Sequence, residues 1–135
     1  MLSKPFLTSE DTKRIAAAAE AEALANRWAV SIAIVDDGGH LLSFQRLDGA
    51  APISSHIAPA KARTAALGRR ESKVYEEVIN GGRVSFLSAP ELEGMLEGGV
   101  PLLADGHCVG AIGVSGVKSS EDAQIAKAGA ACIVG

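Results

Sequence analysis

Two cations and a hydroxyl lie within one helical turn of an alanine-rich segment. Lys61, Arg63 and Thr64 belong to the sequence KART. Residues three apart share a helix face, so Lys61 and Thr64 point one way and Arg63 points another. Side chains of this kind that face a cleft bind carboxylates. The same pattern is typical of a helix packed on a sheet with its long polar tips in water, and both interpretations stay open.

An arginine and an aspartate stand at the end of a predicted strand. Arg46 and Asp48 are two residues apart, so their side chains reach the same rim of a sheet. They pair with each other or with Lys61, which would be structural, or they orient a ligand. The sequence does not choose between these roles.

One histidine is placed where it could ligate a metal. His56 lies near the start of the helix that carries Lys61, and a neutral imidazole there is an accessible ligand for haem iron or another metal. No second ligand is fixed by spacing, so a surface histidine near a helix end is the alternative. His40 and His107 follow turns, and we expect both to be exposed.

The segment 98–116, GGVPLLADGHCVGAIGVSG, predicts a hairpin with a glycine-spaced second strand. Asp-Gly between apolar runs is a strong hairpin signal. The bare glycines predict that a helix, a neighbouring subunit or a ligand packs close to this strand. The run GAIGVSG does not match the dinucleotide-binding pattern G-x-G-x-x-G. We expect the turn formed by Gly98, Gly99, Val100 and Pro101 to close the edge of a pocket.

Composition limits the classes of protein that fit. The 135 residues suit one domain, 47% of them are apolar, and the net charge is −3. A nucleic-acid-binding protein would need a clustered basic face, which is missing. The amino-terminal residues lack the long apolar run of a signal peptide or membrane span. Cys108 and Cys132 have no metal-like spacing, so we expect two buried free thiols and a cytoplasmic location.

Periodicity and capping signals predict helices alternating with hairpins. Thr8 and Asp11 form a capping pattern, and the run VSIAIV is apolar enough for a strand covered on both faces. The expected helices cover residues 8–27, 54–67, 73–79 and 119–132, and the expected strands cover 30–35, 40–47, 83–87, 100–104 and 107–115. Pro59 suggests that regular helix starts close to it or is kinked there. Ser54 or Ser55, Ser72, and Ser119 or Ser120 are the expected caps of the later helices. The fold class is therefore α/β (α+β), one domain with a mainly antiparallel, five-stranded sheet flanked by helices.

Three segments together resemble a known family. They are IVDDGGHLLSFQRLDGA at 34–50, IAPAKARTAA at 57–66 and the hairpin at 98–116. In this order they resemble the GlcG/HbpS-like family, the haem-degrading domain, which is similar to the carboxy-terminal domain of PduO-type proteins. The resemblance covers about 8–131 of a single domain spanning 1–135. It implies a profilin- or PAS-like fold, haem binding or slow haem breakdown in some members, and homo-oligomers from dimer up to octamer.

The resemblance turns the candidates into one expected site. We expect a small ligand, with haem or a related tetrapyrrole first, and no nucleic acid or membrane as partner. His56 stands where the family more usually carries an acidic or another polar residue, and it is the expected iron ligand. Two alternatives remain, namely an enzyme or accessory protein acting on a small organic acid or aromatic catabolic intermediate, and a non-catalytic oligomeric scaffold. The expected ligand-binding set is Arg46, Asp48, His56, Lys61, Arg63, Thr64, Gly98, Gly99, Val100 and Pro101.

Overall fold

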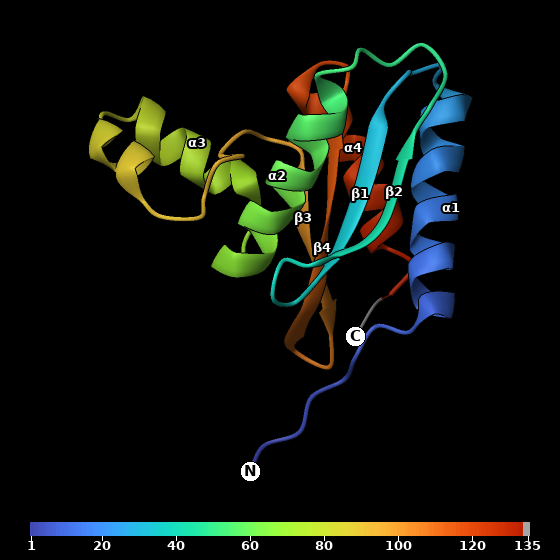
Figure 1. The fold of residues 1–135 in the computed structure, drawn as a ribbon, viewed down its shortest axis with the longest axis horizontal. Coiled ribbons are helices and arrows are strands. Elements are labelled where there is room, and N and C mark those ends of the chain that lie inside the picture. The colour runs from blue at the N-terminus through green and yellow to red at the C-terminus, as the bar shows by residue number, and fades with distance from the viewer. Residues whose placement is uncertain (134–135) are drawn as a thin grey trace.

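Two hairpins join edge to edge to form one antiparallel sheet (Figure 1). The computed structural model describes residues 1–133. The first hairpin pairs β1 with β2, the second pairs β3 with β4, and β1 pairs with β4 in the middle. The strand order is therefore β2-β1-β4-β3. The strands are β1 (Ser31–Asp36), β2 (Leu41–Arg46), β3 (Gly99–Ala104) and β4 (His107–Ser115).

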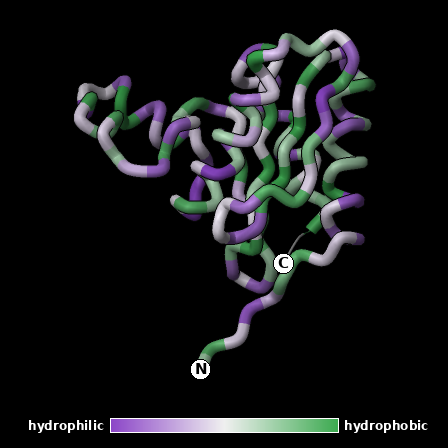
Figure 2. Tube along the Cα trace, viewed as in Figure 1, coloured by the Kyte–Doolittle hydropathy of each residue, from purple (hydrophilic) through white to green (hydrophobic). Residues whose placement is uncertain are grey.

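Helices cover both faces of the sheet. In Figure 1, α2 lies in front of the strands, α1 and α4 lie behind and beside them, and α3 projects from the β3 side. The helices are α1 (Ser9–Ala25), α2 (Ser54–Gly68), α3 (Ser72–Asn80) and α4 (Ser119–Ala130), with a short 3₁₀ helix, η1 (Val84–Ser88). Figure 2 shows hydrophobic residues concentrated on the central strands between these layers.

The two faces of the sheet have different cores, as the predicted burial of the first strand on both sides requires. Behind the sheet, large branched side chains such as Ile15, Ile34 and Ile112 pack together. Under α2 the core consists almost entirely of alanine, with Ala33 and Ala111 of the sheet against the alanines of the helix. Small side chains let helix and sheet approach closely.

Glycines make that approach possible. A Cβ atom added at Gly94, Gly99 or Gly113 would overlap backbone atoms of α2. Of the three neighbours predicted for the bare strand, a helix is therefore the one that lies against Gly113. Gly116 lies against the backbone before β1 instead, so each glycine serves a particular contact.

Over the described residues 1–133 the sheet has four strands, and the fifth strand expected at 83–87 is wrong. Residues 84–88 form η1, in which the Phe86 N–H donates to the Arg83 carbonyl at 3.1 Å. The Phe86 ring packs on Tyr75 of α3 with a centroid distance of 5.3 Å. This contact draws the segment to α3 and away from the sheet.

The predicted helix starts are partly confirmed. Thr8 caps α1 with Asp11 in a reciprocal capping box. α2 begins at Ser54 and continues through Pro59. The expectation that regular helix starts close to Pro59 is therefore wrong. Ser54 uses its hydroxyl on the Ala51 carbonyl at 2.6 Å rather than on a helix N–H. Ser72 and Ser119 are the first residues of their helices and not the caps.

The two cysteines are free, as expected, but they are not both buried. Cys108 is half-buried in β4, and Cys132 is exposed after α4. His40 and His107 are exposed, as predicted. Within residues 1–133, no helix is both long and apolar enough to cross a membrane.

Replacing Gly113 tests the close packing of α2. We expect Gly113→Ala to lower the free energy of unfolding by about 1–3 kcal/mol, because the added methyl group overlaps the helix backbone. Thermal unfolding followed by circular dichroism measures the effect. Gly81→Ala is the matched control, because Gly81 has ordinary backbone angles and lies at an exposed helix end. Equal melting temperatures for the two variants would contradict the packing argument.

Candidate functional site

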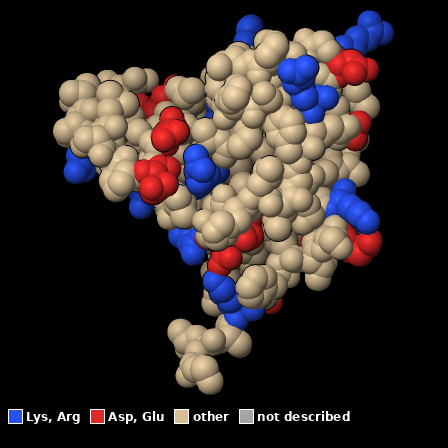
Figure 3. Space-filling model, in the orientation of Figure 1, with Lys and Arg blue, Asp and Glu red and all other residues tan. Residues whose placement is uncertain are grey.

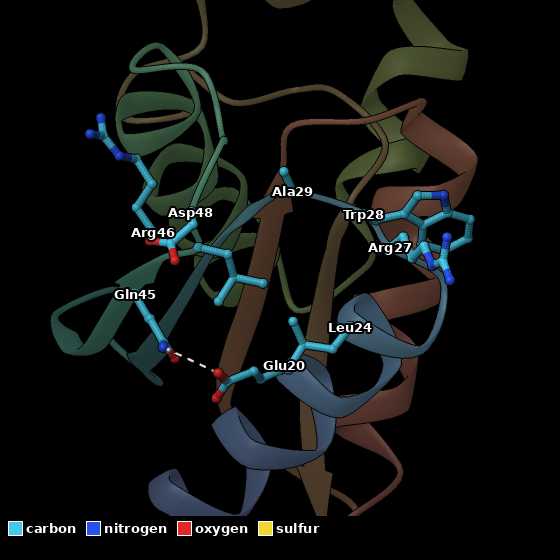
Figure 4. Close-up of a pocket in the computed structure, with 9 residues that line it drawn as sticks. Glu20, Leu24, Arg27, Trp28, Ala29, Gln45, Arg46 and Asp48 are labelled. Carbon is cyan, nitrogen blue, oxygen red and sulfur yellow. Dashed lines mark hydrogen bonds between the residues drawn. The ribbon is translucent and has the colours of Figure 1, made fainter.

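A groove of about 360 Å³ lies where the end of α1 meets the end of β2 (Figure 4). Two of the predicted site residues, Arg46 and Asp48, form part of its wall. Both are exposed. The lining residues are Glu20, Leu24, Arg27, Trp28, Ala29, Gln45, Arg46, Leu47 and Asp48.

The end of α1 shapes one wall of the groove. Arg27 follows the helix in the left-handed region, with φ 57°, a conformation that costs a non-glycine residue about 1 kcal/mol. The chain then turns back, and the Trp28 N–H donates to the Ala23 carbonyl at 2.9 Å. Trp28 packs partly against the core, and Figure 4 shows the Arg27 side chain beside it.

The groove carries both signs of charge. Arg27 and Glu20 come from the α1 side, and Arg46 and Asp48 come from the β2 side. The Gln45 amide donates across the groove to Glu20 Oε1 at 3.4 Å. Within residues 1–133, neither Arg46 nor Asp48 forms an ion pair, so the predicted pairing of these two residues with each other or with Lys61 is not formed.

His56 lies at the same end of the sheet as the groove. Ser54 Oγ lies 2.8 Å from Ser31 Oγ, and Ser31 pairs with Arg46 across the two strands. The start of α2 is thereby fixed beside the end of β2. His56, in the first turns of α2, is exposed.

Lys61 is buried and its ammonium has two acceptors. Its side chain is 3% exposed, and its ammonium donates to the Val114 carbonyl at 3.0 Å and to Asp122 Oδ2 at 3.1 Å. The other Asp122 oxygen accepts the Val117 N–H at 3.2 Å. Burial raises the pKa of the Asp122 carboxyl, and the nearby ammonium opposes that shift. Lys61 therefore ties α2 to β4 and α4 in this structure.

Most of the other expected ligand residues are also inside the protein. Thr64 is fully buried and its hydroxyl accepts the Gly94 N–H at 3.2 Å. The expected turn at residues 98–101 is instead the entry into β3, where Gly98, Gly99 and Val100 are buried and Pro101 is half-buried. A Cβ at Gly98 would lie 2.8 Å from Lys61 Nζ.

Arg63 lies at the other end of the sheet, under the turn between β1 and β2. A Cβ at Gly39 would lie 2.8 Å from Arg63 Cγ, and Arg63 Nε is buried without a hydrogen-bond partner among the described residues. The structure thus brings Arg46, Asp48 and His56 to one end, buries Lys61, and sets Arg63 apart.

Sequence reasoning missed the α1 side of the groove. Glu20 and Arg27 are seven residues apart, which would place them on one face of the helix expected over 8–27, although α1 ends at Ala25. Their spacing marks a polar stripe, but nothing local shows that the end of β2 lies beside it. Among residues 1–133, no group of three or more His, Cys, Asp or Glu side chains is arranged to hold a metal ion.

Comparisons with known proteins agree on one family. The family model described as haem-degrading protein HbpS-like matches residues 7–131. Protein GlcG of Escherichia coli is 54% identical over 115 residues, which are 85% of each chain. The crystal structure of HbpS aligns with a TM-score of 0.90 at 32% identity, covering 100% of this chain and 95% of that one. The crystal structure of a PduOC:haem complex aligns with a TM-score of 0.86 at 29% identity, covering 96% of each chain.

Removing the buried ammonium tests the role of Lys61. We expect Lys61→Ala to cost about 3–5 kcal/mol at neutral pH, because it leaves the Asp122 carboxylate buried without a cation. The pKa of Asp122, already raised by burial, rises further in the variant. The folded variant then holds a proton that the unfolded chain releases, so its stability falls as pH rises above the ordinary aspartate pKa.

The measurement is urea unfolding of both proteins near pH 4 and pH 7. The penalty of Lys61→Ala should be smaller at the lower pH, where Asp122 is closer to neutral. Lys73→Ala is the control, because Lys73 makes an exposed contact with Glu97 at 3.8 Å and should cost little at either pH. A pH-independent penalty would exclude the proposed cause.

Proposed function

The chain belongs to the HbpS-like family, and on that premise we propose that it binds haem or a related tetrapyrrole at the groove between α1 and β2. The observation that carries the proposal is the pair of open polar side chains, Arg46 and Asp48, on a groove whose other wall holds Arg27 and Trp28. The similarity to a PduOC:haem complex over 96% of both chains supports the choice of ligand.

The groove suits the periphery of a haem better than its iron. Figure 4 shows Arg27 and Arg46 on opposite sides of the groove, so each guanidinium group would hold a different carboxylate. Trp28 and Leu24 offer apolar surface. The nine lining residues include no His, Cys, Met or Tyr, which are the usual axial ligands. His56, the exposed imidazole at the same end of the sheet, is the residue that would hold the iron. When bound, haem supplies an iron that can react with peroxide or oxygen.

The buried members of the expected set have a supporting part in this proposal. Lys61, Thr64 and the segment 98–101 hold α2 and β3 in place, and α2 in turn presents His56. Arg63 lies too far along α2 to join the same ligand, because it sits under the opposite turn. The residues that we propose to touch the ligand are Arg27, Trp28, Arg46, Asp48 and His56.

We also propose that the chain acts as a homo-oligomer in the cytoplasm. Support for self-association comes from the exposed apolar side chains of Leu41, Leu42 and Phe44 on an edge strand. Two free cysteines, one of them exposed, fit a reducing compartment.

A small organic acid is the second candidate ligand. The lack of an iron-ligating side chain in the groove favours it, because a single guanidinium group can hold a carboxylate through two hydrogen bonds without any metal. In that case Asp48, which forms no ion pair within residues 1–133, would be the group that exchanges a proton with the substrate.

Haem titration separates the two candidates. We expect wild-type protein to give a Soret band at a stoichiometric ratio of haem. The Arg46→Ala variant should bind haem about tenfold more weakly, because it loses a propionate contact. The His56→Ala variant should shift the Soret band. Arg83→Ala, an exposed arginine on the far side of α3, is the matched control and should bind like wild type.

A panel of small carboxylic acids in a thermal-shift assay completes the test. No spectral change with excess haem would exclude the tetrapyrrole proposal. Stabilisation by a carboxylic acid, lost in Arg46→Ala and kept in Arg83→Ala, would then establish the second candidate.

A further inference from the structure

The two edges of the sheet are built differently. On the β3 edge, the Gly99 N–H donates a hydrogen bond to Ser72 Oγ at 2.8 Å, and Ser72 is the first residue of α3. Groups that face outward alternate along a strand, so residue 101 faces outward as well. That residue is Pro101, which has no N–H to offer. Proline and a covering element are the usual protection of a sheet edge.

The β2 edge has neither a proline nor a covering element, and its one irregularity is the extra residue Leu42, where the pairing with β1 shifts register. Leu41, Leu42 and Phe44 are 58%, 44% and 38% exposed, and the strand contains no proline. The Leu47 N–H donates to the Val30 carbonyl in the β1 direction at 2.9 Å. By alternation the backbone groups of Phe44 and Arg46 therefore face outward. Figure 3 shows a broad face with few charged side chains over β2 and much of α2.

We propose that a second copy of this chain pairs with the β2 edge, antiparallel to β2, around a twofold axis at Phe44. Each Phe44 then lies opposite the same residue of the other copy, as an isologous interface requires. The two four-stranded sheets become one continuous sheet, and the exposed backbone groups are satisfied. This inference rests on the proposed self-association and does not depend on haem binding.

Charge selects this register. With Phe44 at the axis, Arg46 faces the segment of the second copy around Leu42, where β2 carries an extra residue, so Arg46 meets no charged side chain there. A shift that centres the axis on Arg46 would set two guanidinium groups face to face, which is unfavourable. The strand thus complements itself best with its aromatic residue at the centre.

The pairing places the two grooves at the same junction. Gln45 and Arg46 belong both to β2 and to the groove wall. Phe44 pairs with Ala33 across β1 and β2, and Ala33 belongs to the core under α2. Phe44 is therefore on the α2 face, where the two rings would pack against each other.

Light scattering after size exclusion gives the first test. We expect wild-type protein to be a dimer or a multiple of one, and Phe44→Asp to halve the assembly or reduce it to monomer. Leu103→Asp is the matched control, because Leu103 is an exposed leucine on the protected edge strand and should leave the mass unchanged. Circular dichroism checks that both variants are folded.

Disulfide trapping gives the second test and does not rely on weakening the protein. Residues opposite each other in a hydrogen-bonded antiparallel pair have Cα atoms about 5.5 Å apart, within disulfide range. In a Cys108→Ser, Cys132→Ser background, mild oxidation should convert Phe44→Cys to a covalent dimer and leave Leu103→Cys monomeric.

The outcomes separate this inference from the proposed function. An assembly that survives Phe44→Asp, with no crosslink through Phe44→Cys, would overturn the β2 interface and leave self-association standing. A wild-type chain that stays monomeric at every concentration would overturn both. Haem titration is read independently of either result.

Discussion

The distance between α2 and the sheet governs the rest of the structure. Alanines on the helix and glycines on the strands and the loop before β3 remove the side chains that would otherwise hold the helix further from the sheet. Backbone packs nearly on backbone at Gly99 and Gly113. With the helix so low, the Lys61 side chain cannot turn outward and instead extends past Gly98 to Val114 and Asp122.

This constraint moves the candidate site away from the helix that first suggested it. α2 covers β1, β4 and β3 and leaves β2 largely free (Figure 1). The open polar groups and the exposed apolar groups of the sheet therefore meet on the same strand. Arg46 lines the groove on one side of β2, and Phe44 marks its free edge. Binding and self-association are both concentrated where the helix does not reach.

Local signals in the sequence were sufficient for the elements but not for their partners. Thr8 with Asp11 predicted a capping box, and Asp105 with Gly106 predicted the second hairpin, because each motif is complete within a few residues. The strand predicted at 83–87 was wrong, since the ring of Tyr75 decides the path of that segment.

The candidate site was predictable only in part, for the same reason. Arg46 and Asp48 were found because a strand end places them on one rim. The burial of Lys61 depends on Asp122, which lies in the last helix, and no spacing rule links two such distant positions. The α1 wall of the groove likewise depends on the packing of α1 beside β2, so Arg27 had no partner in the sequence pattern.

The buried ion pair complements what the glycines do. A buried pair is weak support for stability, since apolar residues of the same size often stabilise the fold as well or better.

The ion pair matters instead because it positions α2 along the sheet. Small residues recur along α2 and permit close contact in more than one register. They therefore set the distance between the helix and the sheet but not the position of the helix along the strands. Lys61 has two acceptors, on β4 and on α4, and a slip of α2 by one turn would withdraw the ammonium from both and leave Asp122 buried and charged. The pair therefore fixes the register of α2, and with it the position of His56 at the end of the sheet where the groove lies.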